Sequence, residues 1–197
     1  MTTIILASNN KDKVKEVKEI LKGYNVISLK DAGIDLDVEE NGTTFKENAT
    51  IKAKYWAEKL NMPVLAEDSG IEIDALNGYP GVYTKRCIEK LRPGAKANTD
   101  KPDELYPVLL ELMSESGNPS TQAKWVSAMA FIDSEKEVFA TEYLLGDMCP
   151  CTGERVFGFD QYFRPTGLNK TLSELSPEEK DSYGPRKRAF ESILSQL

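Results

Sequence analysis

The spacing of apolar residues along this 197-residue chain predicts alternating strands and helices. Short runs of β-branched or alternating apolar residues predict strands. The run at 122–132 is apolar on both faces, which is typical of a strand in the middle of a sheet. The polar segment Asp133-Ser134-Glu135-Lys136 then predicts a hairpin to the next strand. The predicted strands are 3–7, 24–29, 63–67, 71–75, 122–132 and 138–145.

Helices are predicted where apolar residues recur every three or four positions. Residues 44–60 carry such a stripe, and Ser176-Pro177-Glu178-Glu179 is a capping box with proline at the first helical position. Further helices are expected directly after Asn10 and around 105–113. Strands and helices in this order predict an α/β or α+β fold on a mixed, extended sheet. The length predicts a single domain, 1–197, that can include two lobes.

Composition narrows the class of protein. The chain is 40% hydrophobic and 29% charged, as in ordinary globular proteins, with a formal net charge of -7. Nucleic acids and anionic membranes attract basic surfaces, so neither is an expected partner. We expect a cytoplasmic protein, because the sequence has no apolar run of about 18 residues and no signal-peptide pattern. The three cysteines, Cys87, Cys149 and Cys151, fit a reducing compartment.

The absence of histidine restricts the possible chemistry. Nucleophile systems that pair serine or cysteine with histidine are excluded. A thiolate metal site is not expected either, since Cys149-Pro150-Cys151 lacks the Cys-x-x-Cys spacing. Acid–base chemistry must therefore come from carboxylates, lysines, tyrosines or metal-bound water.

One segment, Ala66-Glu67-Asp68-Ser69-Gly70, places two consecutive carboxylates after a short apolar run. Acidic residues avoid protein interiors unless they are paired or hold a metal. We expect a sharp turn at Ser69-Gly70, with Asp68 at a bend between strands 63–67 and 71–75. Two interpretations remain open here: a site for a hard cation, or a solvated turn after a strand.

Three other polar segments could contribute to a site. Ser8-Asn9-Asn10 lies between a strand and a helix, next to Lys13, where free backbone N–H groups and the helix dipole favour phosphate; a plain N-capped helix is the alternative. Glu39 and Glu40 end an acidic segment that is either solvated or part of the site. The basic residues Lys180 and 186–188 either face a negative ligand or balance the acidic loops.

Several motifs occur together in one order along nearly the whole chain. They are Ser8-Asn9-Asn10-x-x-Lys13, Gly42-x-Thr44-Phe45-x-Glu47-Asn48-Ala49, Ala66-Glu67-Asp68-Ser69-Gly70, Asp74-Ala75-Leu76-x-Gly78-x-Pro80-Gly81-Val82-Tyr83, Phe157-Gly158-Phe159-Asp160 and Glu178-Glu179-Lys180. In this combination the sequence resembles the inosine triphosphate pyrophosphatase (Ham1-like) family. The resemblance implies an α/β fold with an elongated central mixed sheet flanked by helices, two lobes around a nucleotide cleft, and a homodimer.

The resemblance also implies an activity and a set of site residues. The expected reaction is hydrolysis of ITP, dITP or XTP to the monophosphate and pyrophosphate, with Mg²⁺, or alternatively Mn²⁺, as cofactor. Glu39 and Asp68 are the implied metal ligands; Asp68, Glu39 and Lys13 are the implied catalytic residues, with Asp68 activating water. The implied substrate-binding residues are Ser8, Asn9, Asn10, Lys13, Lys52, Ser69, Lys85, Phe157, Gly158, Phe159, Asp160, Lys180 and Arg186.

The chain departs from the family pattern at the predicted base pocket. It has Gly184-Pro185-Arg186 where the family usually has Ser-His-Arg, and Gln161 where proline follows the aspartate. Losing a buried hydrogen-bond donor changes binding by about 1–3 kcal/mol, so base preference is expected to shift. Two alternatives to the enzyme stay open: a nucleotide-binding protein without turnover, and an acidic scaffold whose lysines only balance charge.

Overall fold

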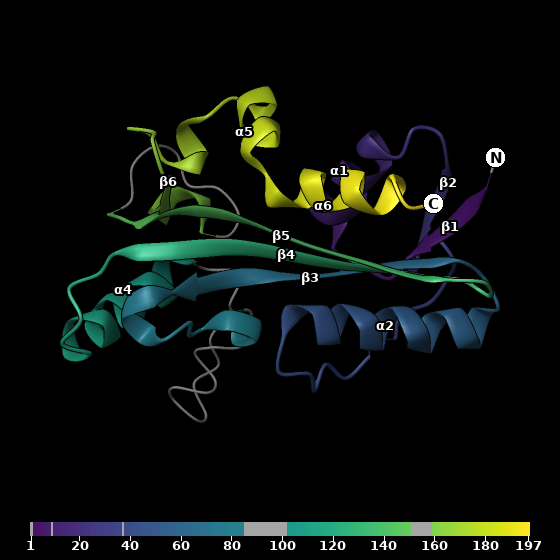
Figure 1. Ribbon diagram of the computed structural model, residues 1–197, viewed down its shortest axis with the longest axis horizontal. Helices are drawn as coiled ribbons and strands as arrows, with labels where there is room; N and C mark the ends of the chain where they lie inside the picture. Colours follow the sequence, from purple (N-terminus) through teal and green to yellow (C-terminus); the bar gives the residue numbers. More distant parts are fainter. Residues whose placement is uncertain (1, 9, 37, 85–101, 151–158) are drawn as a thin grey trace. The chain divides into compact units, whose positions relative to one another are not determined.

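The computed structural model describes residues 2–8, 10–36, 38–84, 102–150 and 159–197 (Figure 1). Its six strands form one sheet in the order β2-β1-β3-β4-β5-β6. The strands are β1 (Thr3–Leu6), β2 (Asn25–Ser28), β3 (Val64–Ile73), β4 (Gln122–Ile132), β5 (Glu137–Met148) and β6 (Phe163–Pro165). The described α-helices are α1 (Lys11–Ile20), α2 (Phe45–Leu60), α4 (Pro102–Glu115), α5 (Pro177–Tyr183) and α6 (Pro185–Leu194).

The sheet is mixed, as predicted. β1 pairs in parallel with β2 and β3, whereas β5 pairs antiparallel with β6. β4 and β5 are neighbours joined by a short turn, in which the Asp133 N–H donates to the Lys136 carbonyl at 3.1 Å. A connection this short joins only antiparallel strands, so the predicted hairpin is confirmed.

The chain divides into two compact units. Unit 1 consists of Met1–Ser69, Ser127–Glu142 and Arg186–Leu197, and unit 2 consists of Gly70–Val126 and Tyr143–Pro185. β3, β4 and β5 each contribute residues to both units. The cleft between two lobes stays a prediction.

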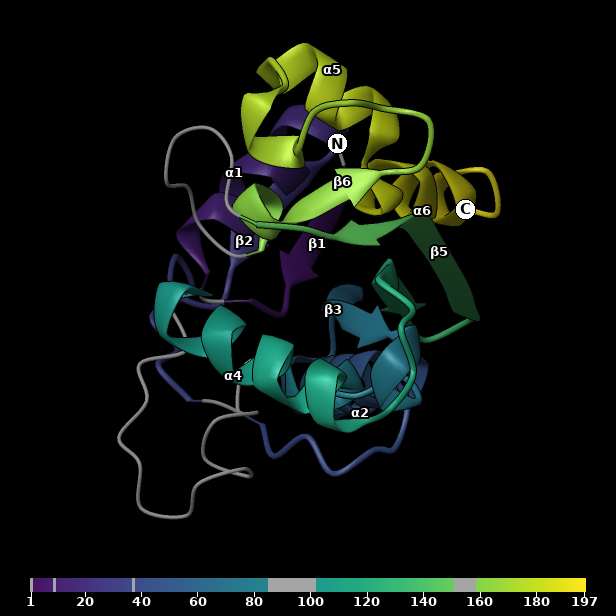
Figure 2. The ribbon, with the colours of Figure 1, turned by 90° about the vertical axis from the view of Figure 1, so that its left-hand side faces the viewer.

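Unit 1 has helices on both faces of its strands (Figures 1 and 2). Successive side chains of a strand point to opposite faces. In β1, Ile4 and Leu6 pack with α1 and α6, whereas Ile5, together with Ala7 just after the strand, packs with α2. The same alternation continues in β3, where Leu65 belongs to the first cluster and Ala66 to the second.

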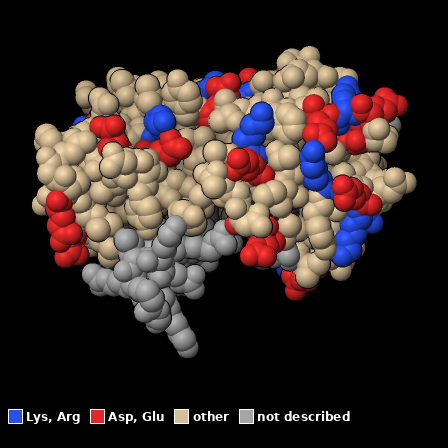
Figure 3. Space-filling model, turned by 60° about the horizontal axis from the view of Figure 1, so that its bottom comes forward, with Lys and Arg blue, Asp and Glu red and all other residues tan. Residues whose placement is uncertain are grey.

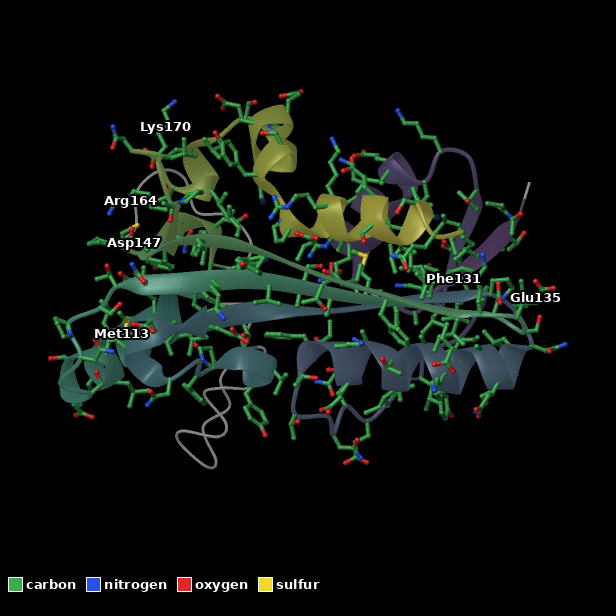
Figure 4. All side chains as sticks on the ribbon, viewed as in Figure 1. Met113, Phe131, Glu135, Asp147, Arg164 and Lys170 are labelled. Atoms are coloured by element: carbon green, nitrogen blue, oxygen red, sulfur yellow. The ribbon has the colours of Figure 1, made fainter. Side chains whose placement is uncertain are left out.

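Unit 2 has its own apolar core. Leu105 and Leu109 of α4 pack in one cluster with Ile71 and Ile73 of β3 and Phe163 of β6. Figure 4 labels Asp147 and Arg164, which face each other across the β5–β6 pair with side chains 3.9 Å apart. The predicted start of α5 is confirmed, since Ser176 and Glu179 form both hydrogen bonds of the capping box.

The predicted turn at Ser69-Gly70 is wrong. β3 runs without interruption through Asp68, Ser69 and Gly70, and every residue from Val64 to Asp68 is buried. β3 lies between β1 and β4 in the sheet, with β1 paired at Val64 and Leu65, and its residues in unit 1 are covered on both faces. This tertiary environment overrides the local turn preference of the Asp-Ser-Gly sequence.

None of the helices in the described ranges combines the length and the apolar character needed to cross a membrane. Figure 3 shows one face of the molecule, on which described lysine and arginine side chains lie among aspartate and glutamate side chains.

Candidate active site

Glu67 and Asp68 are neighbours on β3 and point to opposite faces of the sheet in unit 1. Glu67 contacts Lys13 of α1 and Arg186 of α6, while Asp68 contacts Asn48 of α2. This difference follows from the two-residue period of a strand. Two adjacent carboxylates therefore have different surroundings.

Glu67 lies in a dense network of positive charges and donors, with only 4% of its side chain exposed. Arg186 Nε donates to both carboxylate oxygens at 2.9 and 3.0 Å, and Ser127 Oγ donates at 2.9 Å. Lys13 Nζ lies 3.3 Å from Oε2, and Arg186 Nη1 also bonds Glu16. Burial alone would raise the pKa of Glu67, but the charges of Arg186 and Lys13 and these hydrogen bonds lower it to about 2. Glu67 therefore stays ionised near neutral pH and is a poor proton acceptor.

Asp68 has the opposite electrostatic environment. Burial raises its pKa, and the nearby Glu40 raises it further, although Lys52, Lys13 and the bond from Asn48 act in the other direction. Asn48 Nδ2 donates to Oδ2 at 3.0 Å, and the Ser69 N–H donates to Oδ1 at 3.0 Å. Neighbouring carboxylates with pKa values moved apart are typical of sites for acid–base chemistry.

Two lysines from different helices place ammonium groups beside these carboxylates. Lys13 Nζ donates to Ser69 Oγ at 3.0 Å, and its burial lowers its pKa despite the charge of Glu67. Lys52 Nζ donates to the Glu67 carbonyl oxygen at 2.7 Å and pairs with Glu40 at 2.8 Å. Ammonium groups held this way can neutralise phosphate oxygens. The structure thus places five of the predicted site residues around Glu67 and Asp68: Lys13, Lys52, Asp68 itself, Ser69 and Arg186.

Local sequence explains where these helices begin. Thr44 caps α2 and forms a capping box with Glu47, so the helix starts at Phe45 and presents Asn48 and Lys52 one turn apart. At α1, Asn10 Oδ1 accepts the Lys13 N–H at 3.2 Å, and Ser8 Oγ accepts the Asn10 N–H at 3.2 Å. Ser8 and Asn10 therefore cap α1, and the phosphate role predicted for this turn stays a prediction.

The acidic segment that contains the predicted metal ligand Glu39 also contains Glu40. Glu39 is exposed, whereas Glu40 is half-buried, pairs with Lys52 and acts electrostatically on Asp68. The metal-binding role expected of Glu39 stays a prediction, and Glu40 is a second candidate for that role. Within the described residues, no three His, Cys, Asp or Glu side chains gather into a metal-ligand cluster. Mg²⁺ is commonly held by one or two protein carboxylates together with substrate phosphates, so Asp68 and Glu40 are a suitable donor set.

The other predicted substrate-binding residues fall into separate groups. Asn9, Lys85, Phe157 and Gly158 lie outside the described residues. Phe159 and Asp160 are buried in unit 2, where the Lys180 ammonium group pairs with the Asp160 carboxylate. Arg186 binds glutamates within unit 1, so a base pocket built from Arg186 and 157–160 stays a prediction.

Sequence reasoning gave no role to Asn48, Ser127 or Glu16. Asn48 had a visible signal, because it is a polar residue on the buried stripe of the predicted helix 44–60, directly before Ala49. Glu16 and Ser127 come from α1 and β4, far from Glu67 in sequence. Only the packing of these elements reveals their contacts.

Comparisons with known proteins identify relatives over the full length. The sequence model described as "Ham1 family" matches residues 4–196. A "dITP/XTP pyrophosphatase" of Aquifex aeolicus is 37% identical over 196 residues, covering 98% of this chain and 96% of the relative. One from Clostridium perfringens is 38% identical over 207 residues, covering 100% of this chain and 98% of the relative.

The solved structure of a Coxiella burnetii HAM1 protein superposes with a TM-score of 0.87 at 30% identity, covering 100% of both chains. The Staphylococcus aureus Ham1 protein gives 0.84 at 33% identity, covering 100% and 98%.

Proposed function

This chain belongs to the Ham1 family, and we propose from that membership that it hydrolyses dITP, XTP and ITP to the nucleoside monophosphate and pyrophosphate. The observation that carries the proposal is the contrast between Glu67 and Asp68 on β3. One carboxylate is held ionised within a positive network, and the other has a raised pKa beside two lysines. Such a pair suits a reaction in which water attacks a highly charged phosphate.

Each group has a distinct role in the proposed reaction. Water attacks phosphorus and breaks the phosphoanhydride bond between the α- and β-phosphates, and Asp68 accepts the proton that the water loses. Burial raises the pKa of Asp68 in the metal-free protein, and hydrogen bonds from Asn48 and Ser69 orient its carboxylate. Lys13 and Lys52 lower the repulsion between the nucleophile and the phosphate oxygens. Glu67 supports Lys13 and does not itself exchange a proton.

We propose Mg²⁺ as the cofactor, with Mn²⁺ as a substitute. Asp68 and Glu40 would hold the ion. Asp68 accepts one hydrogen bond on each carboxylate oxygen and so can still coordinate a cation, and Glu40 lies close enough to Asp68 to act on it electrostatically. When bound, the ion supplies charge neutralisation and a template for in-line attack. Removal of divalent ions with EDTA is expected to abolish turnover, and Mg²⁺ to restore it.

Pyrophosphate release from dITP and XTP tests the reaction directly. The wild-type protein is expected to release pyrophosphate, and Asp68→Asn to lose turnover while it keeps the wild-type circular dichroism spectrum. Wild-type-like turnover in Asp68→Asn would remove Asp68 from the mechanism. A nucleotide-binding protein without turnover would give a thermal shift with nucleotide but no pyrophosphate, and a charge-balanced scaffold would give neither.

We further propose that Pro185 alters base selectivity. Pro185 is buried and begins α6 directly before Arg186, and it offers no hydrogen-bond donor from its side chain or its backbone nitrogen. A panel of ITP, dITP, XTP, dUTP, GTP and ATP is expected to show a broadened or redirected preference. A sharp preference for ITP, dITP and XTP over dUTP, GTP and ATP would contradict this part of the proposal.

A homodimer and a cytoplasmic location complete the proposal. The homodimer rests on the family resemblance, and the cytoplasmic location fits proposed substrates that belong to the nucleotide pool. Size-exclusion chromatography with light scattering tests the dimer, for which we expect twice the chain mass of 22.0 kDa.

A further inference from the structure

The side chain of Asn48 joins the two segments that carry the acidic groups of the proposed site. Its Nδ2 donates to Asp68 Oδ2 at 3.0 Å, and its Oδ1 accepts the Gly42 N–H at 2.9 Å. Gly42 follows Glu40 by two residues. Asn48 is 1% exposed, so water does not replace either contact. One buried carboxamide thus holds both Asp68 and the end of the segment that bears Glu40.

The chemistry of these contacts requires a carboxamide in one orientation. Gly42 offers only an N–H donor to Asn48, and the ionised Asp68 carboxylate offers only acceptors. Rotating the amide by 180° would put oxygen against the carboxylate and NH₂ against the Gly42 N–H, so the network fixes the orientation. Aspartate at position 48 would lose the donor, and leucine would lose both contacts.

The surrounding structure makes Asn48 a rigid support. It lies in the second turn of α2, whose start is fixed by the capping box of Thr44 and Glu47. Residue 42 must approach it closely, because a Cβ there would lie 2.7 Å from Asn48 Oδ1 and 2.7 Å from Glu47 Cβ. Only glycine fits at 42 without displacing Asn48. The hydrogen bond from Gly42 to Asn48 therefore depends on the identity of both residues, as does the hydrogen bond from Asn48 to Asp68.

We propose that Asn48 is a positioning residue that holds the Asp68 carboxylate and the Glu40-bearing loop in the arrangement that binds a divalent cation. Asn48 itself touches neither cation nor substrate; it acts through Asp68 and Gly42. The inference rests on the proposed function for its role in turnover, whereas its effect on cation binding can be measured without nucleotide.

The test compares Asn48→Ala with a control on the same helix. Ala53→Gly leaves both Asn48 contacts intact, but it lowers helix propensity and removes a buried methyl group, so it controls for a general loss of stability. Binding of Mn²⁺ to the nucleotide-free protein is measured by electron paramagnetic resonance. Loss of a residue that orients a metal ligand typically weakens metal binding 10- to 100-fold, and we expect a loss of about this size in Asn48→Ala but not in Ala53→Gly. The Mg²⁺ concentration for half-maximal turnover is expected to rise in parallel.

Gly42→Ala tests the same contact from the loop, and it decides the question if Asn48→Ala does not fold. It is expected to weaken Mn²⁺ binding in the same direction. Mn²⁺ affinities within about twofold of Ala53→Gly in the folded variants would overturn the inference, as would a wild-type protein that binds no Mn²⁺. If the wild type binds Mn²⁺ but releases no pyrophosphate, and Asn48→Ala binds Mn²⁺ more weakly, then the proposed reaction fails and the positioning role stands.

Discussion

Replacing Glu67 by glutamine should destabilise the protein in a way that depends on pH. Glu67→Gln keeps the size of the side chain and removes its charge, while Arg186 and Lys13 stay in place. The Arg186 contacts at 2.9 and 3.0 Å and the Lys13 contact at 3.3 Å then lose their carboxylate. Removing one partner of a buried ion pair typically costs about 3–5 kcal/mol at neutral pH.

The pKa of Glu67 gives an independent magnitude. The folded protein lowers it from 4.5 to about 2, a difference of about 2.5 pH units, which corresponds to about 3 kcal/mol of unfolding free energy. Because the folded pKa is the lower one, this contribution is fully present above pH 4.5 and is lost as the pH falls toward 2. Between pH 7 and pH 3 the unfolding free energy of the wild type should therefore fall by about 2 kcal/mol through Glu67. Glu67→Gln lacks this carboxylate and should not show this part of the decrease.

Urea unfolding at pH 7, 5, 4 and 3, followed by tryptophan fluorescence, measures this difference. The gap between wild type and Glu67→Gln should be largest at pH 7 and should narrow by about 2 kcal/mol at pH 3. Glu142→Gln is the matched control, since Glu142 pairs with Arg188 at 3.5 Å and both side chains are more than one-third exposed. Its effect should stay below about 1 kcal/mol. A gap for Glu67→Gln that is constant with pH, or as small as that of Glu142→Gln, would refute the reasoning.

Three further outcomes are expected. Asp68→Asn should be inactive, yet at pH 7 it should unfold at the same temperature as the wild type or at a higher one. Burial raises the pKa of Asp68, so its ionised form opposes folding, and a clear loss of stability measured by calorimetry would contradict this. Lys52→Met should raise the pKa of Asp68 further, so the acidic limb of the pH profile of kcat/KM should move to higher pH. A limb that stays in place would show that the charge of Lys52 does not act on Asp68. Thr44→Ala removes the cap of α2 and should cost about 1 kcal/mol in urea unfolding, and an effect near zero would mean that Glu47 alone holds the helix start.

Locally encoded features of this fold could be predicted from sequence. The capping boxes at Thr44 and Ser176 involve residues three positions apart, so the sequence contains the whole interaction. The apolar stripe of α2 and the two apolar faces of β4 similarly reflect only the period of each element. The short strand β6 and the helix α6 were not predicted, because three residues make too short a pattern and α6 follows α5 after a single residue.

Features set by tertiary packing were missed or displaced. Asp-Ser-Gly favours a turn in isolation, yet β3 stays extended through Asp68 within a sheet in which it lies between β1 and β4. Glu39 and Glu40 are indistinguishable in an acidic segment without a regular period, and only the structure shows that Glu40 pairs with Lys52. The contacts of Glu67 with Ser127 and Arg186 join positions 60 and 119 residues apart, which no local pattern encodes.

The continuity of β3 restricts how related sequences can change in length. Glu67 and Asp68 face different helices only because each occupies one position of an alternating strand. Inserting or deleting a single residue between Val64 and Glu67 would exchange the two faces, and would turn the aspartate toward Arg186 and the glutamate toward Asn48. We therefore expect natural variants of this chain to accept substitutions within this strand but to place their insertions and deletions in the loops.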